Sequence, residues 1–317
     1  MSDAEGPGGP VAGGAVGGAG VGSPGPGGSG DGGRGDGGRG RPVVPAPALF
    51  MASGVSLYLG AALAVSLFAV LPPTDVAWWR IAVAAVFLLL WRRPWRRVWT
   101  WRTAAGSALF GVVLGGMNLL FYGAIAHLPL GTAVSLEYLG PVAVAALTGR
   151  GLRARLALVL AAGGVLAISG FGVDWSAPGT ASGVALALAA GASWAVYILL
   201  GRRIAAGRSG LDSLSMAMPV SALVFVPVAA GTVGRVIGDP ALLLAVVGVG
   251  VLSSLVPYAI EQVALTRLPA VTFALLTSLL PATSLLVGLL VLRQVPSVGE
   301  VLGLVLVSAA VALATRE

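Results

Sequence analysis

Three ionisable residues stand inside long apolar stretches of this 317-residue chain, where charged side chains are rare. Glu137 lies in TAVSLEYLGP, Glu261 in VPYAIEQVAL, and Arg80 near the start of an apolar stretch that follows Asp75. A charge near the centre of a bilayer costs roughly 3 kcal/mol, so intramembrane ionisable residues usually serve binding or proton transfer. Glu137, in the middle of its stretch, is the first candidate for a carboxyl that exchanges protons, and Glu261 is its competitor.

Uncharged polar and aromatic residues accompany these groups at helical spacing. Asn118 and Tyr122 (i, i+4) share one helix face, as do Tyr258 and Glu261 (i, i+3) on another helix, where Gln262 is adjacent. Trp194 and Tyr197 pair in the same way. The candidate substrate-binding or proton-coupling residues are therefore Glu137, Glu261, Asn118, Tyr122, Tyr258, Trp194, Tyr197, Gln262 and Arg80.

Each charged candidate also has a structural interpretation. Glu137 would then be a buried neutral acid bonded to backbone. Glu261 would snorkel to the inner interface or pair with Arg267, and Arg80 would anchor its helix at the outer interface. Most tryptophans fit an aromatic belt at the membrane surfaces, which is the expected place of Trp78, Trp79, Trp95, Trp99 and Trp101. Glu300 begins the last apolar segment, where an acid suits the helix dipole.

The sequence lacks the residues that several kinds of chemistry require. There is no Walker loop for an ATP-driven motor, no Ser-His-Asp or Gly-x-Ser-x-Gly constellation, and no cysteine. His127 is the single histidine and is expected at a helix boundary. The sequence therefore predicts no enzyme activity, no metal site and no cofactor.

The composition excludes an ordinary soluble domain, because 57% of the residues are hydrophobic, 10% are charged and the mean hydropathy is +0.94. Residues 1–46 hold 19 glycines and six prolines, which predicts a disordered cytoplasmic tail. The remainder has room for roughly ten spans of about 20 residues. The apolar segments lie at 48–71, 76–91, 103–126, 130–148, 155–171, 180–200, 212–233, 241–265, 269–291 and 298–315.

Loop arginines indicate the orientation in the membrane. If the N-terminus is cytoplasmic, 16 of the 19 arginines fall on the inside, Arg235 and Arg293 fall outside, and Arg80 lies within the second segment. The outer loops instead carry Asp75, Asp174 and Asp239. This asymmetry favours an even number of spans with both termini inside the cell.

An internal repeat appears at a shift of 140 residues. AIAHLPLGTAVSLEYLGP at 124–141 aligns without gaps with ALTRLPAVTFALLTSLLP at 264–281, and both prolines of each copy coincide. The shift equals five segments, and an odd number inverts the second copy in the membrane. The predicted fold is all-α, with ten transmembrane helices in two inverted five-helix repeats at 47–171 and 172–317, as in many secondary transporters.

Three stretches make a resemblance specific: GGMNLLFYGAIAHLPLGTAVSLEYLGPVAVAAL, GASWAVYILLGRR and VPYAIEQVALTRLPAVTF. Over residues 48–315 the chain resembles the RhtA-type threonine/homoserine exporters, in the EamA branch of the drug/metabolite transporter superfamily. The resemblance implies ten helices in two inverted halves and proton-driven export of small neutral amino acids. The family's polar positions fall on Asn118, Tyr122, Glu137, Trp194, Tyr197, Tyr258 and Glu261.

Two positions depart from the family pattern. The family often has an acid just before a proline in its ninth helix, where this chain has Leu280 in the segment 269–291. It often has a Gly-Glu pair before its tenth helix, where this chain has Arg293-Gln294. The resemblance therefore leaves open which acid couples transport to protons.

We interpret the chain as a secondary-active exporter of small neutral amino acids in the plasma membrane, exchanging substrate for protons. Its partners would be the substrate, protons and the lipid bilayer, and no nucleic acid. The alternatives are a drug or other-metabolite exporter on the same fold, and a non-transporting membrane scaffold or sensor that recruits a partner through its basic loops. Intramembrane acids and an inverted repeat argue against a scaffold, which needs neither.

Overall fold

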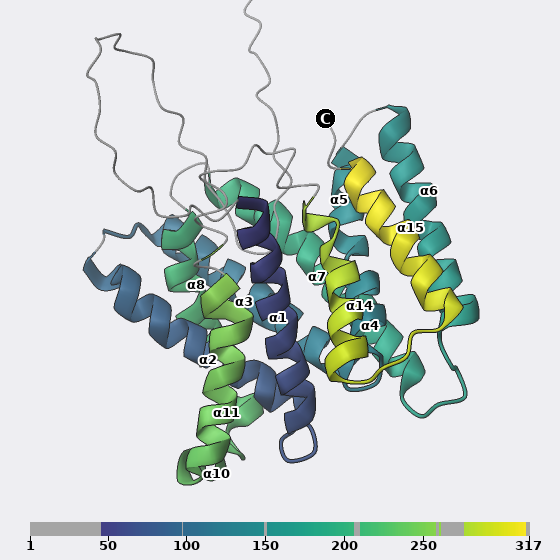
Figure 1. The fold of residues 1–317 in the computed structure, drawn as a ribbon. Helices are drawn as coiled ribbons and strands as arrows, with labels where there is room; N and C mark the ends of the chain where they lie inside the picture. Colours follow the sequence, from purple (N-terminus) through teal and green to yellow (C-terminus); the bar gives the residue numbers. More distant parts are fainter. Residues whose placement is uncertain are drawn as a thin grey trace, which may run out of the picture.

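The computed structural model describes residues 46–96, 98–148, 151–205, 210–257, 260 and 276–314, so the Gly-rich segment before Ala46 lies outside the described part. The described residues form a helical bundle without strands (Figure 1). Within the described ranges, six helices are long and apolar enough to cross a membrane, and four shorter apolar helices of 10–17 residues accompany them. The all-helical membrane fold expected from composition is confirmed.

The elements up to residue 172 include five of the six long apolar helices. These elements are α1 (Ala46–Leu67), α2 (Pro73–Arg92), the 3-10 turn η1 (Pro94–Arg96), α3 (Trp101–Ile125), α4 (Leu130–Glu137), α5 (Leu139–Thr148), α6 (Leu152–Ala167) and the π-helix η2 (Ile168–Gly172). The segments expected at 76–91 and 155–171 are longer in the structure and include flanking residues, at 73–92 and 152–172.

The second half is more broken. Its elements are α7 (Thr180–Ala205), α8 (Gly210–Val224), α9 (Val226–Ala229), α10 (Val233–Gly238), α11 (Pro240–Gly250), the π-helix η3 (Val251–Leu255), α14 (Leu280–Val291) and α15 (Val298–Ala314). The segment expected at 212–233 is interrupted at Phe225, two residues before Pro227. Pro227 lies in the first turn of α9, where its missing amide needs no partner, and it cannot donate to the Leu223 carbonyl oxygen as a continuous helix would require.

Side chains at the helix ends satisfy the first amides. Thr100 and Thr103 form a capping box at α3, and the Asp239 carboxylate accepts from the amides of Ala241 and Leu242 at α11. Glu300 forms a second box with Ser297 at α15: the Ser297 amide donates to Glu300 Oε2 at 2.8 Å, and Ser297 Oγ accepts from the Glu300 amide at 3.2 Å. The helix-start role expected for Glu300 is thus confirmed.

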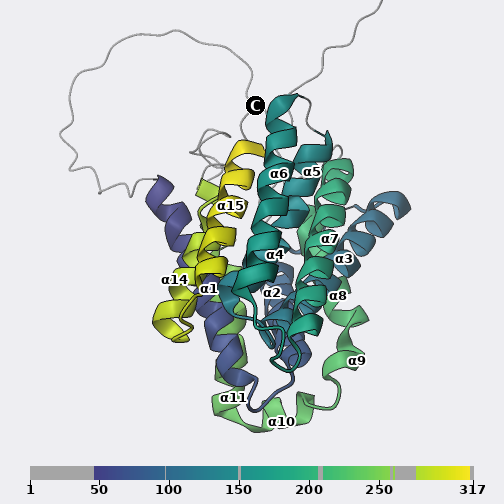
Figure 2. The ribbon, with the colours of Figure 1, turned by 90° about the vertical axis from the view of Figure 1, so that its right-hand side faces the viewer.

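Helices distant in sequence pack side by side. α3 packs on α7 and α8, α2 packs on α8, and α6 packs along α15, as both views show (Figures 1 and 2). α4 contacts α14, and α1 contacts both α14 and η3. Every such pair joins the first half of the chain to the second, so the two halves share one core.

Glycine allows two helix crossings, of α5 with α7 and of α3 with α8, to be very close. A Cβ on Gly140 would lie 1.9 Å from the Gly191 carbonyl oxygen, and one on Gly111 would lie 2.2 Å from the Ala217 carbonyl oxygen. In contrast, a Cβ on Gly163 would meet nothing nearer than Leu306 Cδ1 at 3.6 Å. Small residues in membrane helices serve such backbone approaches, and here only some of the glycines do.

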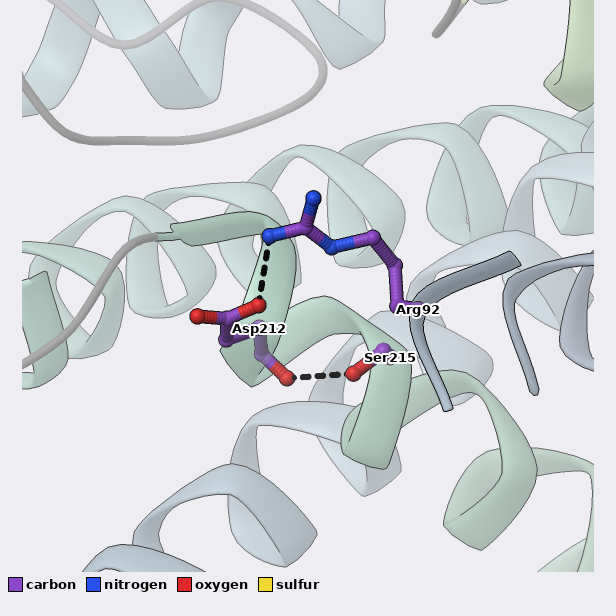
Figure 3. A network of polar contacts seen from close by, with 3 residues as sticks. All are labelled: Arg92, Asp212 and Ser215. Atoms are coloured by element: carbon purple, nitrogen blue, oxygen red, sulfur yellow. Dashed lines mark hydrogen bonds and ion pairs between the residues drawn. The ribbon is translucent and has the colours of Figure 1, made fainter. Parts of the chain in front are cut away.

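An ion pair joins the basic end of α2 to the start of α8. Arg92 Nη2 donates to Asp212 Oδ1 at 2.6 Å, and the Asp212 side chain is only 8% exposed (Figure 3). The Asp212 carbonyl oxygen accepts from Ser215 Oγ at 2.7 Å. Arg92 was expected only as a cytoplasmic topology signal, and it has this structural partner as well.

Asp212→Asn is expected to lower the free energy of unfolding by about 1–3 kcal/mol, because a partly buried Arg92 loses its counter-charge. Thermal unfolding in detergent measures the effect. Asp239→Asn is the matched control, since it removes the same charge at an exposed helix cap that asparagine fills equally well. Equal midpoints for the two variants would refute a stabilising ion pair.

Candidate functional site

A cavity lies between the helices at the level where α4 meets α5. It has a volume of about 60 Å³. Its walls come from α1, α2, α3, α7, η3 and the α4–α5 junction. The lining residues are Leu57, Tyr58, Ala61, Arg80, Leu114, Met117, Asn118, Phe121, Tyr122, Glu137, Tyr138, Trp194 and Ser253.

Arg80 points into this cavity and bonds across it. Its Nε donates to Ser254 Oγ at 3.1 Å, and its Nη1 donates to Asn118 Oδ1 at 2.5 Å. Its guanidinium carbon lies 5.8 Å from the centre of the Tyr122 ring, within cation–π range. An interfacial anchor would point toward the membrane surface, so that interpretation of Arg80 is wrong.

The backbone of η3 supplies the third partner of Arg80. Its Nη2 donates to the Ser253 carbonyl oxygen at 2.9 Å. In a regular α-helix this carbonyl would accept from the amide of residue 257, which is Pro257 and has no amide hydrogen. Proline thus frees an acceptor inside the span, and the arginine uses it.

α3 presents two neighbours of Arg80 from one face. Asn118 is held by its own helix, since its Nδ2 donates to the Leu114 carbonyl oxygen at 2.8 Å, which aims its oxygen at Arg80. One turn later, Tyr122 is completely buried, and its hydroxyl has no hydrogen-bond partner among the described residues. The i, i+4 pair expected from the sequence therefore faces the cavity.

Glu137 lies at a break in its helix rather than in mid-helix as expected. α4 ends at Glu137 and α5 begins at Leu139, because Pro141 cannot donate to the Glu137 carbonyl oxygen. That oxygen lies against α7, where a Cβ on Gly191 would approach it to 2.7 Å. The close crossing at Gly191 thus positions Glu137, whose side chain lines the cavity.

Aromatic rings close the side of the cavity next to Glu137. The rings of Tyr138 and Trp194 meet edge to face with centres 4.8 Å apart, and both line the cavity. Tyr197, expected to accompany Trp194, instead stacks on Phe110 at 4.4 Å and does not line the cavity.

Comparison with known proteins places the chain in a family. Residues 181–316 match the EamA-like transporter family. The threonine/homoserine exporter RhtA of Salmonella typhimurium (strain LT2) is 37% identical over 255 residues, which cover 80% of this chain and 86% of the exporter. The chain belongs to the RhtA-type exporters of the EamA-like transporter family. RhtA of Escherichia coli (strain K12) is also 37% identical, over 78% of this chain and 83% of its own length.

A solved structure supports the fold alone. One crystal structure covers 85% of this chain and 96% of its own chain with a TM-score of 0.54 at 19% identity. Together with the apolar helices, the relatives identify the chain as a multi-pass membrane transporter and not an enzyme. The resemblance to this family inferred from the quoted stretches is confirmed.

Three candidate residues belong to the segment expected at 241–265. Tyr258, Glu261 and Gln262 lie outside the described residues, as does Arg267. The cavity wall on this segment comes instead from Ser253.

Four cavity-side residues were missed by sequence reasoning: Tyr58, Tyr138, Ser253 and Ser254. The first three line the cavity, and Ser254 accepts from Arg80. The sequence holds one signal for Ser253, because Pro257 follows it by four residues. It holds another for Tyr138, which directly follows Glu137.

Both departures from the family pattern have structural roles here. Leu280 is buried against α1 at Gly54, and Gln294 Oε1 accepts from the Leu130 amide at 2.9 Å at the start of α4. Thr132 on α4 also donates to Glu300 Oε1 on α15. The contacts of Gln294 and Glu300 join the C-terminal part of the chain to α4, at residues that do not line the cavity.

Some other expectations are corrected. Trp78 and Trp79 are buried rather than interfacial, and Trp78 Nε1 donates to the Ala222 carbonyl oxygen at 2.8 Å. Asp75 is buried in the first turn of α2, not in a loop. Exposed His127 lies close to Gly179, in the loop before α7, and no group of acids and histidine that could hold a metal exists within the described ranges.

Proposed function

We propose that this transporter exports small neutral amino acids of the threonine/homoserine class across the plasma membrane in exchange for protons. The observation that carries the proposal is the cavity between the helices, which combines Arg80, Asn118 and Glu137 in a chain 37% identical to threonine/homoserine exporters. In the proposal, Glu137 exchanges the proton and Glu261 is its competitor.

The dimensions of the cavity favour a small polar substrate over a drug. A buried water needs roughly 10–15 Å³ of such space. A cavity of about 60 Å³ therefore holds only a few waters, so the substrate that needs the least widening of the bundle is a small one. An extended apolar drug would find neither the space nor an uncharged wall beside Arg80 and Glu137.

An inverted repeat, with halves at 47–171 and 172–317, would supply the two alternating states. Several helix contacts support this symmetry. A shift of five spans takes α3 to α11 with η3, and α7 to α1, so the α3–α7 contact corresponds to the observed contact of α11 and η3 with α1. The same shift exchanges α4 and α14, so their contact corresponds to itself. The α2–α8 and α6–α15 contacts also map onto themselves.

The ends of α2 and α8 add a more specific correspondence. Asp75 is the third residue of α2 and Asp212 is the third residue of α8. Each accepts from a group at the far end of the other segment: Asp212 from Arg92, and Asp75 from Thr232 Oγ1 at 2.5 Å. Inverted copies would place such equivalent acids at opposite ends of the same helix pair. Alternating access would then break one contact in each state.

Charge supports an orientation with both termini in the cytoplasm. Arg93 directly follows α2, Arg96 lies in η1, and Arg102 and Arg153 lie in the first turns of α3 and α6. These element ends lie toward the bundle end that holds the end of α15, and α10 lies at the other end (Figure 1). Asp174 lies at the α10 end, and hydrogen bonds from the Ser176 hydroxyl and amide hold the pKa of its carboxyl below the usual range. That end therefore carries fixed negative charge, and the arginine end fits the inside of the cell.

Replacing Arg93, Arg96 and Arg102 together with glutamine is expected to leave the first hairpin in mixed orientations, because these exposed residues hold its connecting loop inside. Topology reporters fused after residue 126 measure the fraction inverted. Arg92→Gln alone is the control, since it breaks the ion pair with Asp212 and leaves most of the loop charge. Uniform wild-type topology in the triple variant would refute this loop assignment.

Transport by the purified protein in liposomes tests the proposed function. With an acidic lumen, threonine or homoserine is expected to accumulate inside as protons leave, and a proton uncoupler should abolish the accumulation. Drug accumulation without amino-acid accumulation would favour the alternative exporter. No transport of any substrate in a panel of amino acids and drugs would favour a scaffold.

A further inference from the structure

Arg80 and Glu137 give this cavity one positive and one acidic side, and nothing so far assigns them to parts of a substrate. We propose that the cavity recognises the zwitterion of an α-amino acid: Arg80 binds the α-carboxylate, and Glu137 with its aromatic neighbours binds the α-ammonium. The assignment rests on the proposed amino-acid export and names what that site selects.

The charge of Arg80 is bonded only to neutral groups within the described residues. Its three hydrogen bonds go to a hydroxyl, an amide oxygen and a backbone carbonyl oxygen, of Ser254, Asn118 and Ser253. The described part of the chain has its ion pair elsewhere, at Arg92 and Asp212. A guanidinium has five N–H donors, so two remain. A carboxylate ligand would take these donors and neutralise a charge that is costly inside a membrane.

The Glu137 carboxyl is the acidic counterpart. It lines the same cavity and interacts electrostatically with Arg80. Among the described residues it neither accepts nor donates a hydrogen bond, although every other described acid in the membrane region has a partner, as Asp75, Asp212 and Glu300 do. Its position is therefore open to a cation from the substrate.

The rings beside Glu137 suit an ammonium group. Trp194 and Tyr138 line the cavity next to it, and their edge-to-face arrangement turns two aromatic surfaces in different directions. Aromatic faces attract desolvated ammonium groups. Glu137 and these rings thus form one subsite, and Arg80 with Asn118 forms the other.

Three buried polar atoms in the cavity wall are available for the substrate's own polar atoms. The Tyr122 hydroxyl, Trp194 Nε1 and Ser253 Oγ are buried without hydrogen-bond partners among the described residues. Buried polar groups are normally satisfied, and leaving one unpaired is costly. A side-chain hydroxyl, as in threonine or homoserine, both donates and accepts, so it matches these groups.

A panel of threonine derivatives on the wild-type protein tests the proposal first. Threonine amide lacks the carboxylate, and N-acetylthreonine lacks the ammonium. Competition with radiolabelled threonine in liposomes is expected to be roughly 10- to 100-fold weaker for each derivative than for threonine, because each loses a charge-assisted contact. Equal competition by all three would overturn the zwitterion assignment while leaving amino-acid export intact. Absence of any threonine transport would instead overturn the proposed function.

Two variants then assign each charge to its side. In Arg80→Gln, threonine is expected to bind no more tightly than threonine amide binds to the wild type. In Glu137→Gln, threonine is expected to bind no more tightly than N-acetylthreonine binds to the wild type. Binding is measured rather than transport, because Glu137→Gln is expected to lose proton coupling. Arg80→Lys retains the charge without the planar fork and is expected to keep the preference for threonine over its amide. This variant covers the case in which Arg80→Gln fails to fold.

The opposite pattern would overturn the assignment. If Arg80→Gln retains full discrimination against the amide, Arg80 does not bind the carboxylate. If Glu261→Gln rather than Glu137→Gln removes discrimination against N-acetylthreonine, the group that binds the ammonium is Glu261.

Discussion

Glu137→Gln is expected to abolish threonine accumulation against a gradient. A pH difference of one unit with one proton exchanged supports up to about tenfold accumulation in the wild type, since one decade of gradient is worth about 1.4 kcal/mol. Glutamine has nearly the same size as glutamate and accepts hydrogen bonds, but it cannot cycle a proton. The accumulation ratio in liposomes with an acidic lumen should therefore fall from about ten to one.

The loss of coupling should be separable from weaker binding. Glutamine can still accept from an ammonium group, so we expect binding of threonine to weaken by roughly tenfold. Raising substrate to saturation would then restore occupancy of the cavity but not accumulation. This combination would not arise from a purely structural role of Glu137, because a structural defect would lower binding, stability and rate together.

Glu300→Gln is the matched control for this variant. Glu300 is also a buried glutamate in the bundle, but Ser297 and Thr132 bond it and the cavity does not include it. It should lose stability and retain the full accumulation ratio. If Glu137→Gln still accumulates threonine and Glu261→Gln does not, the coupling residue is Glu261. Full accumulation in both variants would rule out proton coupling through either acid.

The amino-acid sequence was informative where one polar residue was exceptional for its surroundings. Arg80, Asn118 and Glu137 lie in apolar segments that hold almost no other charged or amide side chain. The structure brings all three to one cavity. The prolines were equally informative, because a missing amide has a definite consequence. Pro141 separates α4 from α5 at Glu137, and Pro257 frees a carbonyl oxygen for Arg80.

Hydroxyl and aromatic residues could not be sorted in the same way. Ser135, Thr148 and Ser193 each donate to the carbonyl oxygen four residues earlier, so a hydroxyl in an apolar helix usually satisfies itself locally. Ser253, which lines the cavity, has the same local sequence character. Tyrosine and tryptophan are similarly ambiguous, since an amphipathic ring suits either a membrane surface or a buried partner.

Adjacent glycines show why packing needs the structure. Gly115 and Gly116 looked equivalent in sequence, but a Cβ on Gly115 would lie 2.1 Å from Ser221 Oγ, and one on Gly116 would have 3.9 Å to Phe225. Residues one position apart point about 100° apart on a helix, so only one of them can face a given neighbour. Which one does so depends on the rotation of the helix in the bundle, and nearly uniform apolar composition leaves that rotation undetermined.

Gly140→Ala is expected to destabilise the transporter by about 3 kcal/mol or more, because the added methyl group would lie 1.9 Å from the Gly191 carbonyl oxygen. That neighbour is backbone and cannot move aside by changing rotamer, so α5 and α7 must separate. Separation would also move Glu137 away from Trp194, and we expect threonine binding to be lost along with stability.

Gly163→Ala isolates the packing effect from the change in helix propensity. Both glycines lie inside helices, and alanine favours the helix by about 1 kcal/mol at either position. At Gly163 the nearest atom is 3.6 Å from the added methyl group, an ordinary contact, so this variant should be neutral or slightly stabilised. Thermal unfolding in detergent and threonine binding by both variants measure the difference. If Gly140→Ala is as stable as Gly163→Ala and binds threonine normally, the close crossing of α5 and α7 does not position the site.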